Sequence, residues 1–285
     1  MGGADLDQMV DAVAQRYPLA RIRATTVLPT TGRNSNVVMA DAGGARFVLR
    51  CYRRNADAAR IEFQLDFQEH LQRRGIPTAQ VIATKTGERL VHDGKHFWVL
   101  FGHVAGTEYD YTSQMQLRHA AQCLAGLHAA AEDFPGPPII DDTIPDVRRW
   151  WTHLRRDFPL EIIDQLPQRW VHADYHGGNL AFADDRVVGV FDFDVVHRGF
   201  RVEDVAHATF CFARESASSN VIRPEMASQF LQQFDLTDLE RRALPVFMVA
   251  TQARNAARYR IREREGADPA RVLRHHVARM RELAQ

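Results

Sequence analysis

The stretch VHADYHGGNLAF (residues 171–182), followed by VFDFD (residues 190–194), contains the most informative residues of the chain. Asp174 and Asn179 lie on a predicted loop between two short strand-like runs, and Asp192 follows at the end of the next apolar strand. Phosphoryl transfer needs one carboxylate to orient or deprotonate a hydroxyl, and oxygen ligands to hold Mg²⁺. These three residues supply that set. Taken singly, each also fits ordinary turn or strand-end chemistry.

Composition narrows the class of protein. The chain has 285 residues and a formal net charge of zero, which fits one large domain or two lobes and gives no basic surface for nucleic acid or an anionic membrane. Cys51, Cys123 and Cys211 are far apart and form no CxxC pair, so we expect buried thiols and a cytoplasmic protein. The N-terminus lacks the apolar core of a signal peptide, and no apolar run has membrane-spanning length.

The first hundred residues predict a small antiparallel sheet with one inserted helix. The strand-like runs SNVVMA and ARFVLRCY flank Gly43-Gly44, a hairpin signal. A helix is expected from Asp57 to Arg74, ended by Gly75. The remaining predicted elements are a helix over residues 5–17 and strands around Thr86-Gly87 and Asp93-Gly94, the last being HFWVLF.

The rest of the chain predicts a mostly helical region. Helices are expected over residues 112–133, from Asp146, after a capping box of Thr237 and Glu240, and from Asp268. Three short strands, RWVHAD, NLAF and RVVGVFD, lie among them. We therefore predict an α+β protein with a β-rich N-lobe (residues 1–101) and a mostly helical C-lobe (residues 102–285). A small ligand is expected in the cleft between the lobes.

Several motifs together resemble the aminoglycoside phosphotransferase and choline kinase family. HADYHGGN is similar to the family's catalytic loop, FDFD to its metal-binding strand end, and VEDVAH to the Asp-Leu-Ala that follows. VLR, the GIP after the helix from Asp57 to Arg74, and LAGLHAA extend the resemblance over roughly residues 30–210. It implies a two-lobed, protein-kinase-like fold, ATP and Mg²⁺ as cofactors, and a small-molecule hydroxyl as phosphate acceptor.

By this resemblance Asp174 is the catalytic base, and Asn179 and Asp192 are the metal ligands. His172 and Asp204 are expected to hold the loop in place. His176 could contact phosphate or substrate, or be a solvated loop residue.

Asp194 stands where protein kinases have glycine. This departure counts against a protein kinase. The carboxylate could support the metal-binding residues or be merely solvated.

The nucleotide side of the predicted site is less sharply marked. TTGRNSN resembles the phosphate-covering loop, in which Gly32, Ser35, Asn36 and backbone N–H groups would bind phosphate. The alternative is a plain polar loop. VLR places Arg50 where kinases usually have lysine, and its planar fork suits both carboxylate and phosphate. The alternative is a surface arginine on a strand.

The resemblance also implies an acid on the helix that pairs with Arg50. Glu62 is the nearest candidate on the helix, although the family's Glu more often falls two positions later, at Gln64. A solvated acidic helix face is the alternative.

The run from Phe97 to Gly106 resembles the hinge. Its backbone from Phe101 to His103 would meet adenine. Glu108 or Asp110 could reach ribose.

Two other functions remain open, a nucleotide-binding pseudokinase and a protein kinase. The intact Asp–Asn–Asp set argues against the first, and the short segment between FDFD and VEDVAH argues against the second. The acceptor is not fixed by the fold. From Arg201 onward there are fourteen Arg against eleven Asp plus Glu, and Arg254, Arg258 and Arg262 share a helix face. A homoserine-like or amino-alcohol acceptor is therefore one hypothesis, and a solvated arginine face is the alternative.

Overall fold

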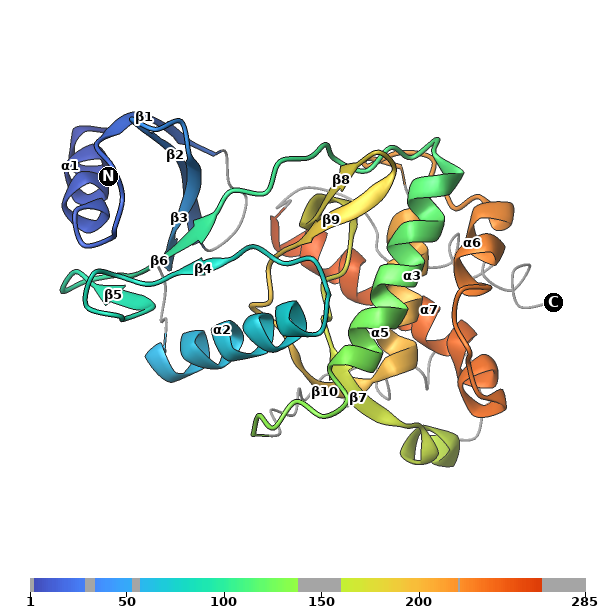
Figure 1. The fold of residues 1–285 in the computed structure, drawn as a ribbon. Helices are drawn as coiled ribbons and strands as arrows, with labels where there is room; N and C mark the ends of the chain where they lie inside the picture. The colour runs from blue at the N-terminus through green and yellow to red at the C-terminus, as the bar shows by residue number, and fades with distance from the viewer. Residues whose placement is uncertain (1–2, 29–33, 53–56, 138–159, 220, 263–285) are drawn as a thin grey trace. The chain divides into compact units, whose positions relative to one another are not determined.

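The structure is a computed structural model, and it describes residues 3–28, 34–52, 57–137, 160–219 and 221–262 (Figure 1). The chain forms two compact units. Unit 1 comprises Met1–Gly106 with Val188–Asp194, and unit 2 comprises Thr107–Val187 with Val195–Gln285. The first segment of unit 1 thus ends five residues beyond the predicted lobe boundary, and a short segment from the middle of the sequence joins it. The helices predicted from Asp146 and Asp268 lie outside the described residues.

Unit 1 is built on a six-stranded antiparallel sheet. Its strands are β1 (Ile22–Val27), β2 (Asn34–Asp41), β3 (Arg46–Tyr52), β4 (Val81–Ile82), β5 (Leu90–His92) and β6 (Phe97–Gly102). Their order is β1-β2-β3-β6-β4, with β5 also paired to β6. The hairpin predicted at Gly43-Gly44 joins β2 to β3, and Gly44 adopts the left-handed φ of +85° that favours glycine.

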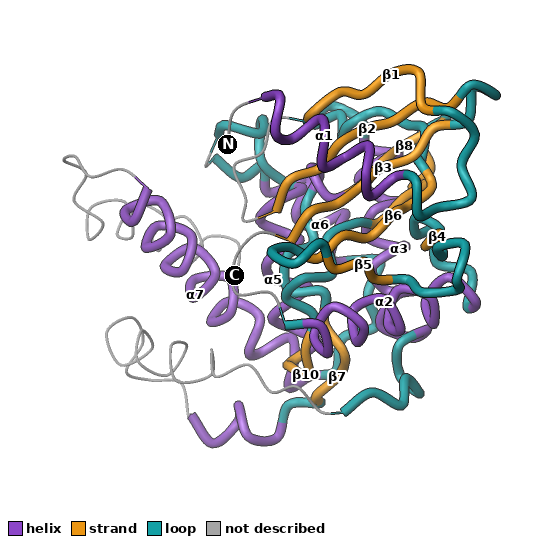
Figure 2. The backbone as a smooth tube through the Cα atoms, turned by 90° about the vertical axis from the view of Figure 1, so that its left-hand side faces the viewer, coloured by secondary structure: helices purple, strands orange, loops and turns teal. Residues whose placement is uncertain are grey.

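Two helices, α1 (Gly3–Ala14) and α2 (Ala58–Arg73), cover this sheet. Side chains alternate along each strand, so Leu49 faces one side of β3 and Arg50 the other. Leu49 belongs to a buried cluster with residues of α1, whereas Tyr52 clusters with Ile61 and Leu65 of α2. Figures 1 and 2 place α1 beside β1 to β3 and α2 beside β4 to β6. Arg50 therefore lies on the α2 side of the sheet.

Helix α2 begins and ends where the sequence predicted. The side chain of Asp57 caps its first turn by accepting a hydrogen bond from the N–H of Ala59. Gly75, with a φ of +84°, closes its C-terminus.

Unit 2 is mostly helical, as expected for the second half of the chain. Helix α5 lies among the other helices and is buried along almost its whole length. The described elements of unit 2 are α3 (Gln114–Ala130), η1 (Leu160–Gln165), β7 (Gln168–Val171), η2 (Gly177–Asn179), β8 (Leu180–Ala183), β9 (Arg186–Val190), β10 (His197–Phe200), α5 (Arg201–Phe212), α6 (Pro224–Leu231) and α7 (Asp238–Arg262). The division between the units falls inside β9. The predicted α+β class is confirmed.

Two local features of unit 2 can be compared with the predictions made from the sequence. The capping box is confirmed, because Thr237 Oγ1 accepts from the N–H of Glu240 and the Glu240 carboxylate accepts from the N–H of Thr237. Strand β10 was not predicted. It pairs antiparallel with β7, a partner about thirty residues earlier in the chain, and the polar run HRGF gives no strand signal by itself.

Two further expectations concern the burial of the cysteines and the apolarity of the helices. All three cysteines are free thiols; Cys51 and Cys211 are buried, and Cys123 is half-buried. Burial raises the pKa of the Cys123 thiol to about 11. Within the described residues, none of the helices combines the length and apolarity needed to cross a bilayer.

Candidate active site

The loop that contains Asp174 in unit 2 is fixed by Asp204, near the start of α5. Asp204 is 1% exposed, and its carboxylate accepts hydrogen bonds from the backbone N–H groups of His172 and Ala173, each over 2.9 Å. His128 Nε2 lies 2.9 Å from the same carboxylate. Burial alone would raise the pKa of Asp204, but the contact with His128 and the loop N–H groups outweigh burial and lower it to about 2. Asp204 thus holds the loop as expected.

These contacts impose an unusual backbone at the residue before Asp174. Ala173 has a φ of +62°, in the left-handed region that costs a residue with a Cβ roughly 1–2 kcal/mol. Strain of this kind persists where surrounding contacts enforce it, and it is concentrated at functional sites. Here the bond from Ala173 N–H to Asp204 enforces it.

Asp174 itself is partly exposed and bordered by two histidines. Its carboxylate oxygens lie 3.7 Å from Nε2 of His176 and 3.9 Å from Nε2 of His207. The Asn179 side chain donates to the Asp174 carbonyl over 2.9 Å. Burial raises the pKa of Asp174, but His176, then His207 and His172, outweigh burial and hold that pKa well below its usual range. The carboxylate is therefore ionised at neutral pH.

Both histidines of the loop itself, His172 and His176, make contacts that hold the loop backbone. His172 is fully buried, and its Nδ1 accepts from the N–H of Asp174 over 3.3 Å. His176 caps η2, its Nδ1 accepting from the N–H of Gly178 over 3.1 Å. Because that nitrogen accepts, the neutral ring has its proton on Nε2, which faces Asp174. The structure thus gives His176 a role that was not among the two predicted alternatives, because its side chain caps the loop.

In unit 1, Arg50 reaches two carboxylates at once. Its Nη2 lies 2.9 Å from Asp192 Oδ1 and 2.8 Å from Asp194 Oδ2. Burial lowers the pKa of Arg50, but Tyr52, Asp194 and Asp192 together hold it above its usual value, so it stays charged. Burial also raises the pKa of Asp194, against the opposing charge of Arg50. Asp192 has a φ of +65°, so the strand end with the predicted metal ligand is strained as well.

Glu62, the candidate partner of Arg50, has a different partner. Its carboxylate pairs with Arg89, which also contacts Asp66 and Glu69 at 2.8 and 3.2 Å. The acidic face predicted for α2 is therefore organised around one arginine. The sequence alone could not show whether Glu62 pairs with Arg50, because the answer depends on the position of the Arg89 side chain beside the helix.

The predicted phosphate-covering residues divide between the two sheet faces. Ser35 is opposite Cys51 in the register and is 2% exposed, on the face of the sheet that α1 covers. Asn36 is opposite Arg50 and shares its face. The side chain of Ser35 therefore points away from Arg50, which corrects its expected role, whereas Asn36 stays a candidate. Gly32 lies outside the described residues.

The predicted hinge ends β6. The N–H of Gly102 donates to Gln80 O over 2.8 Å, and the N–H of His103 donates to Arg46 O over 3.1 Å. Phe101 is paired with Val48 and Val81 in the sheet. A contact from these two N–H groups to adenine would first require their present bonds to break.

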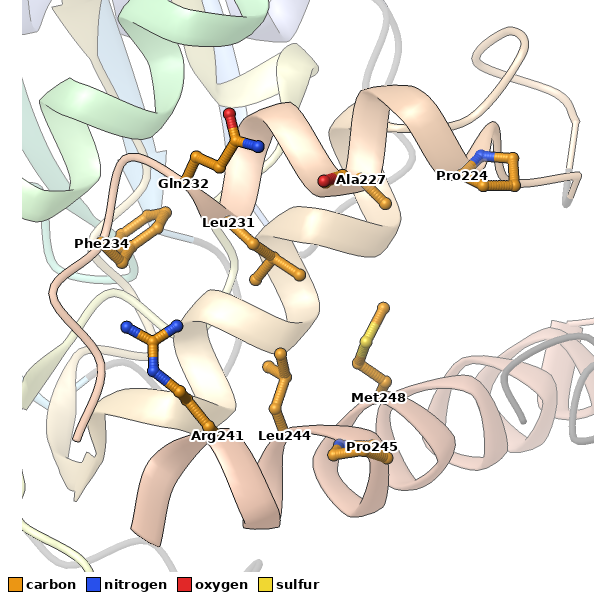
Figure 3. Close-up of a pocket in the computed structure, with 10 residues that line it drawn as sticks. Pro224, Ala227, Leu231, Gln232, Phe234, Arg241, Leu244, Pro245 and Met248 are labelled. Carbon is orange, nitrogen blue, oxygen red and sulfur yellow. The ribbon is translucent and has the colours of Figure 1, made fainter. Parts of the chain in front are cut away.

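A separate cavity of about 460 Å³ lies between α6 and α7 of unit 2 (Figure 3). Figure 3 shows Leu231, Leu244 and Met248 around it, with Arg241 at one side. No predicted site residue lines this cavity. Among the described residues there is also no group of three or more His, Cys, Asp and Glu side chains that could hold a metal ion. A Mg²⁺ ion that keeps waters and phosphate oxygens does not need such a group.

Comparison with known proteins places these features in context. The family model described as "Phosphotransferase enzyme family" matches residues 26–143 and 140–245. A protein named homoserine kinase from Granulibacter bethesdensis is 25% identical over 268 residues, covering 84% of this chain and 81% of its own length. A homoserine kinase from Phenylobacterium zucineum is 25% identical over 234 residues, covering 75% and 72% respectively.

Solved structures with the same fold are more distant in sequence. An amicoumacin kinase in complex with AMP-PNP and Ca²⁺ has a TM-score of 0.74 at 14% identity, covering 99% of this chain and 96% of its own. A microcompartment-associated aminopropanol kinase has a TM-score of 0.65 at 15% identity, covering 98% and 94%. At these identities the likeness shows the fold alone.

Proposed function

This chain belongs to the phosphotransferase enzyme family, and we propose that it transfers the γ-phosphoryl group of ATP to a hydroxyl of a small molecule, with Asp174 as the base. The observation that supports this most directly is the environment of Asp174. Asp204 and Asn179 fix its backbone, and its partly exposed carboxylate stays ionised beside two histidines. An ionised, immobilised carboxylate is suited to accepting a hydroxyl proton.

Asp174 orients the acceptor hydroxyl and takes its proton as the oxygen attacks phosphorus. His176 and His207 lie close enough to contribute to the local field, and the Nε2–H of His176 limits the directions from which a hydroxyl can approach. With the backbone fixed on both sides of Asp174, little reorganisation is needed during the reaction.

The proposed metal ligands fit a hard divalent cation. Asn179 gives its Nδ2 to the Asp174 carbonyl, which fixes the amide and leaves Oδ1 as the oxygen for a metal. Asp192 pairs with Arg50 through Oδ1 only, so Oδ2 lies outside that ion pair. Amide and carboxylate oxygens are ligands that Mg²⁺ prefers, and the bound ion would neutralise phosphate charge.

Arg50 is the proposed phosphate-binding residue. Its side chain is 13% exposed and positively charged, and it lies beside the strand end that contains Asp192. Asn36, opposite Arg50 on the same face, is a second candidate for phosphate contact. The adenine-binding backbone around Phe101 to His103 stays a prediction.

For the acceptor we propose a homoserine-like amino alcohol. Support comes from relatives at 25% identity that are named homoserine kinases, together with the excess of arginine after Arg201. The described arginines qualify this charge argument, since Arg201 is paired with Glu240 at 2.5 Å and Arg223 donates to backbone carbonyls. The side chains of Arg254, Arg258 and Arg262 lie outside the described residues.

The test is an ADP-release screen against homoserine, ethanolamine, choline, aminopropanol, thiamine, simple sugars and a kanamycin-type compound, with Mg²⁺ and with excess chelator. We expect Mg²⁺-dependent turnover that is fastest with an amino alcohol bearing a carboxylate. Turnover only with an aminoglycoside would contradict the acceptor class. If no acceptor in the screen produces ADP while the protein still binds nucleotide, a pseudokinase would be favoured.

A further inference from the structure

Arg50 buries a permanent positive charge, and a buried charge needs a compensating carboxylate. Its Nη2 meets both Asp192 and Asp194 within 2.9 Å. Removing the partner of a buried ion strongly destabilises its neighbourhood. One carboxylate balances the single positive charge of Arg50, so the second acid needs an explanation of its own.

Asp194 is held in place from several directions, all within unit 1. Asn34 Nδ2 donates to its Oδ2 over 2.6 Å, beside the contact with Arg50. Arg60 Nη2 and Gln64 Nε2, both of α2, donate to its backbone carbonyl over 3.1 and 3.3 Å. The carboxylate of Asp194 is therefore aimed at Arg50 by contacts that do not involve Asp192.

Helix α2 provides no acid to Arg50 in the described contacts. Glu62 is engaged by Arg89, and two positions later the chain has Gln64, whose amide donates to Asp194 instead. A carboxylate at position 64 would repel the Asp194 carbonyl, whereas the amide binds it. Gln64 and Asp194 thus form one arrangement, in which the helix orients the acid rather than supplying it.

Building on the proposed function, we propose that Asp194 is the positioning residue of Arg50, the ion-pair partner that keeps its guanidinium directed at the nucleotide phosphates. Asp192 is then left to its metal role. When Asp192 is engaged elsewhere, Arg50 retains a carboxylate 2.8 Å from its Nη2, so its orientation does not depend on a single shared acid. The competing role for Asp194 is that of an additional metal ligand.

A double-mutant cycle on nucleotide affinity separates the two roles. Calorimetry measures AMP-PNP binding with Mg²⁺, when the proposed metal role would occupy Asp192, and again in excess chelator, for the full chain and for Arg50→Ala, Asp194→Asn and both together. We expect Arg50→Ala to weaken binding roughly tenfold in the otherwise unchanged chain and less than about threefold in the Asp194→Asn background, as is usual for directly coupled residues. Asp66→Asn is the matched control, an equal charge change on α2 at a residue that pairs with Arg89.

Other results of the same measurement would overturn the proposal. If Arg50→Ala weakens AMP-PNP binding equally in both backgrounds, Asp194 does not position Arg50. If Asp194 is instead a metal ligand, the two substitutions should be additive in chelator, and Asp194→Asn should weaken binding only when Mg²⁺ is present. That result leaves the proposed function intact. Failure of the unaltered chain to bind nucleotide would instead overturn both proposals. Circular dichroism and the Tm check folding, and Asp194→Ser replaces Asp194→Asn if the latter does not fold.

Discussion

The side-chain amide of Asn179 donates a hydrogen bond to the backbone carbonyl of Asp174 over 2.9 Å. The bond spans the loop and ties the proposed metal ligand to the proposed base. A change in the position of either residue is therefore transmitted to the other, which makes conservative substitutions more informative here than truncations.

Asp174→Asn should lower kcat by roughly 10²–10⁴, the usual contribution of a positioned base, because an amide cannot accept the hydroxyl proton. AMP-PNP affinity should change little. Steady-state kinetics on the acceptor found in the screen, with calorimetry for the nucleotide, measure both quantities. Asp184→Asn, at an exposed position of the β8–β9 turn with a φ of +47°, is the matched control. Near-full turnover in Asp174→Asn would exclude Asp174 as the base.

Asp192→Asn should abolish detectable turnover and weaken nucleotide binding more with Mg²⁺ than in chelator, because the amide is a weaker ligand for a hard cation. Asparagine is chosen because it adopts the φ of +65° at this position at a lower cost than alanine does. Titration of Mg²⁺ at saturating ATP gives the apparent metal affinity. Equal loss of binding with and without Mg²⁺ would assign Asp192 to supporting Arg50 alone.

Glu62→Gln should leave kcat/KM within about twofold of the unaltered chain, because Glu62 pairs with Arg89 and not with Arg50. The loss of stability should be below about 1 kcal/mol, the usual range for an exposed ion pair. Chemical denaturation and steady-state kinetics measure the two quantities. A large rise in the KM for ATP would restore Glu62 to the nucleotide site.

Ser35→Ala should leave the KM for ATP within about twofold, because the side chain lies on the buried α1 face of the sheet. Asn36→Ala, the adjacent change on the face of Arg50, should raise that KM several-fold if Asn36 contacts phosphate. The pair is measured side by side under the same Mg²⁺ concentration. A larger effect in Ser35→Ala would mean that the strand register differs from that described.

Asp204→Asn should destabilise the chain by roughly 3 kcal/mol or more, because an amide cannot accept from both loop N–H groups and His128. The pKa of Asp204 is lowered in the folded protein to about 2, from about 4 in an unfolded chain. Its stabilisation is therefore complete above about pH 4 and lost as pH falls through about 2. Denaturation of both proteins between pH 7 and 2 should show the difference shrinking only at the acid end.

Local signals in the sequence were sufficient for much of the fold. The turn at Gly43-Gly44, the end of α2 at Gly75 and the capping box at Thr237 each depend on residues within four positions of one another, and each is confirmed. The contact of Asp204 with the loop was also expected, through the resemblance.

Contacts between distant residues were not predictable in the same way. Arg50 and Asp194 are 144 positions apart, and their contact depends on which face of β3 the Arg50 side chain takes and on the segment Val188–Asp194 joining unit 1. Asn34, Gln64 and His207 were missed as site residues for the same reason. Polar side chains at Asn34 and Gln64 were the available signal, but a polar residue in a sequence does not identify its partner.

The segment Val188–Asp194 joins unit 1 although both of its flanking segments belong to unit 2. Arg50 finds both of its carboxylates in this segment. A fragment ending at Gly106 would therefore lack both counter-ions of Arg50, and exchange of N-terminal units between relatives at a single crossover would separate Arg50 from its two acids. The two units are interleaved in the gene, so recombination that respects the structure needs three junctions, not one.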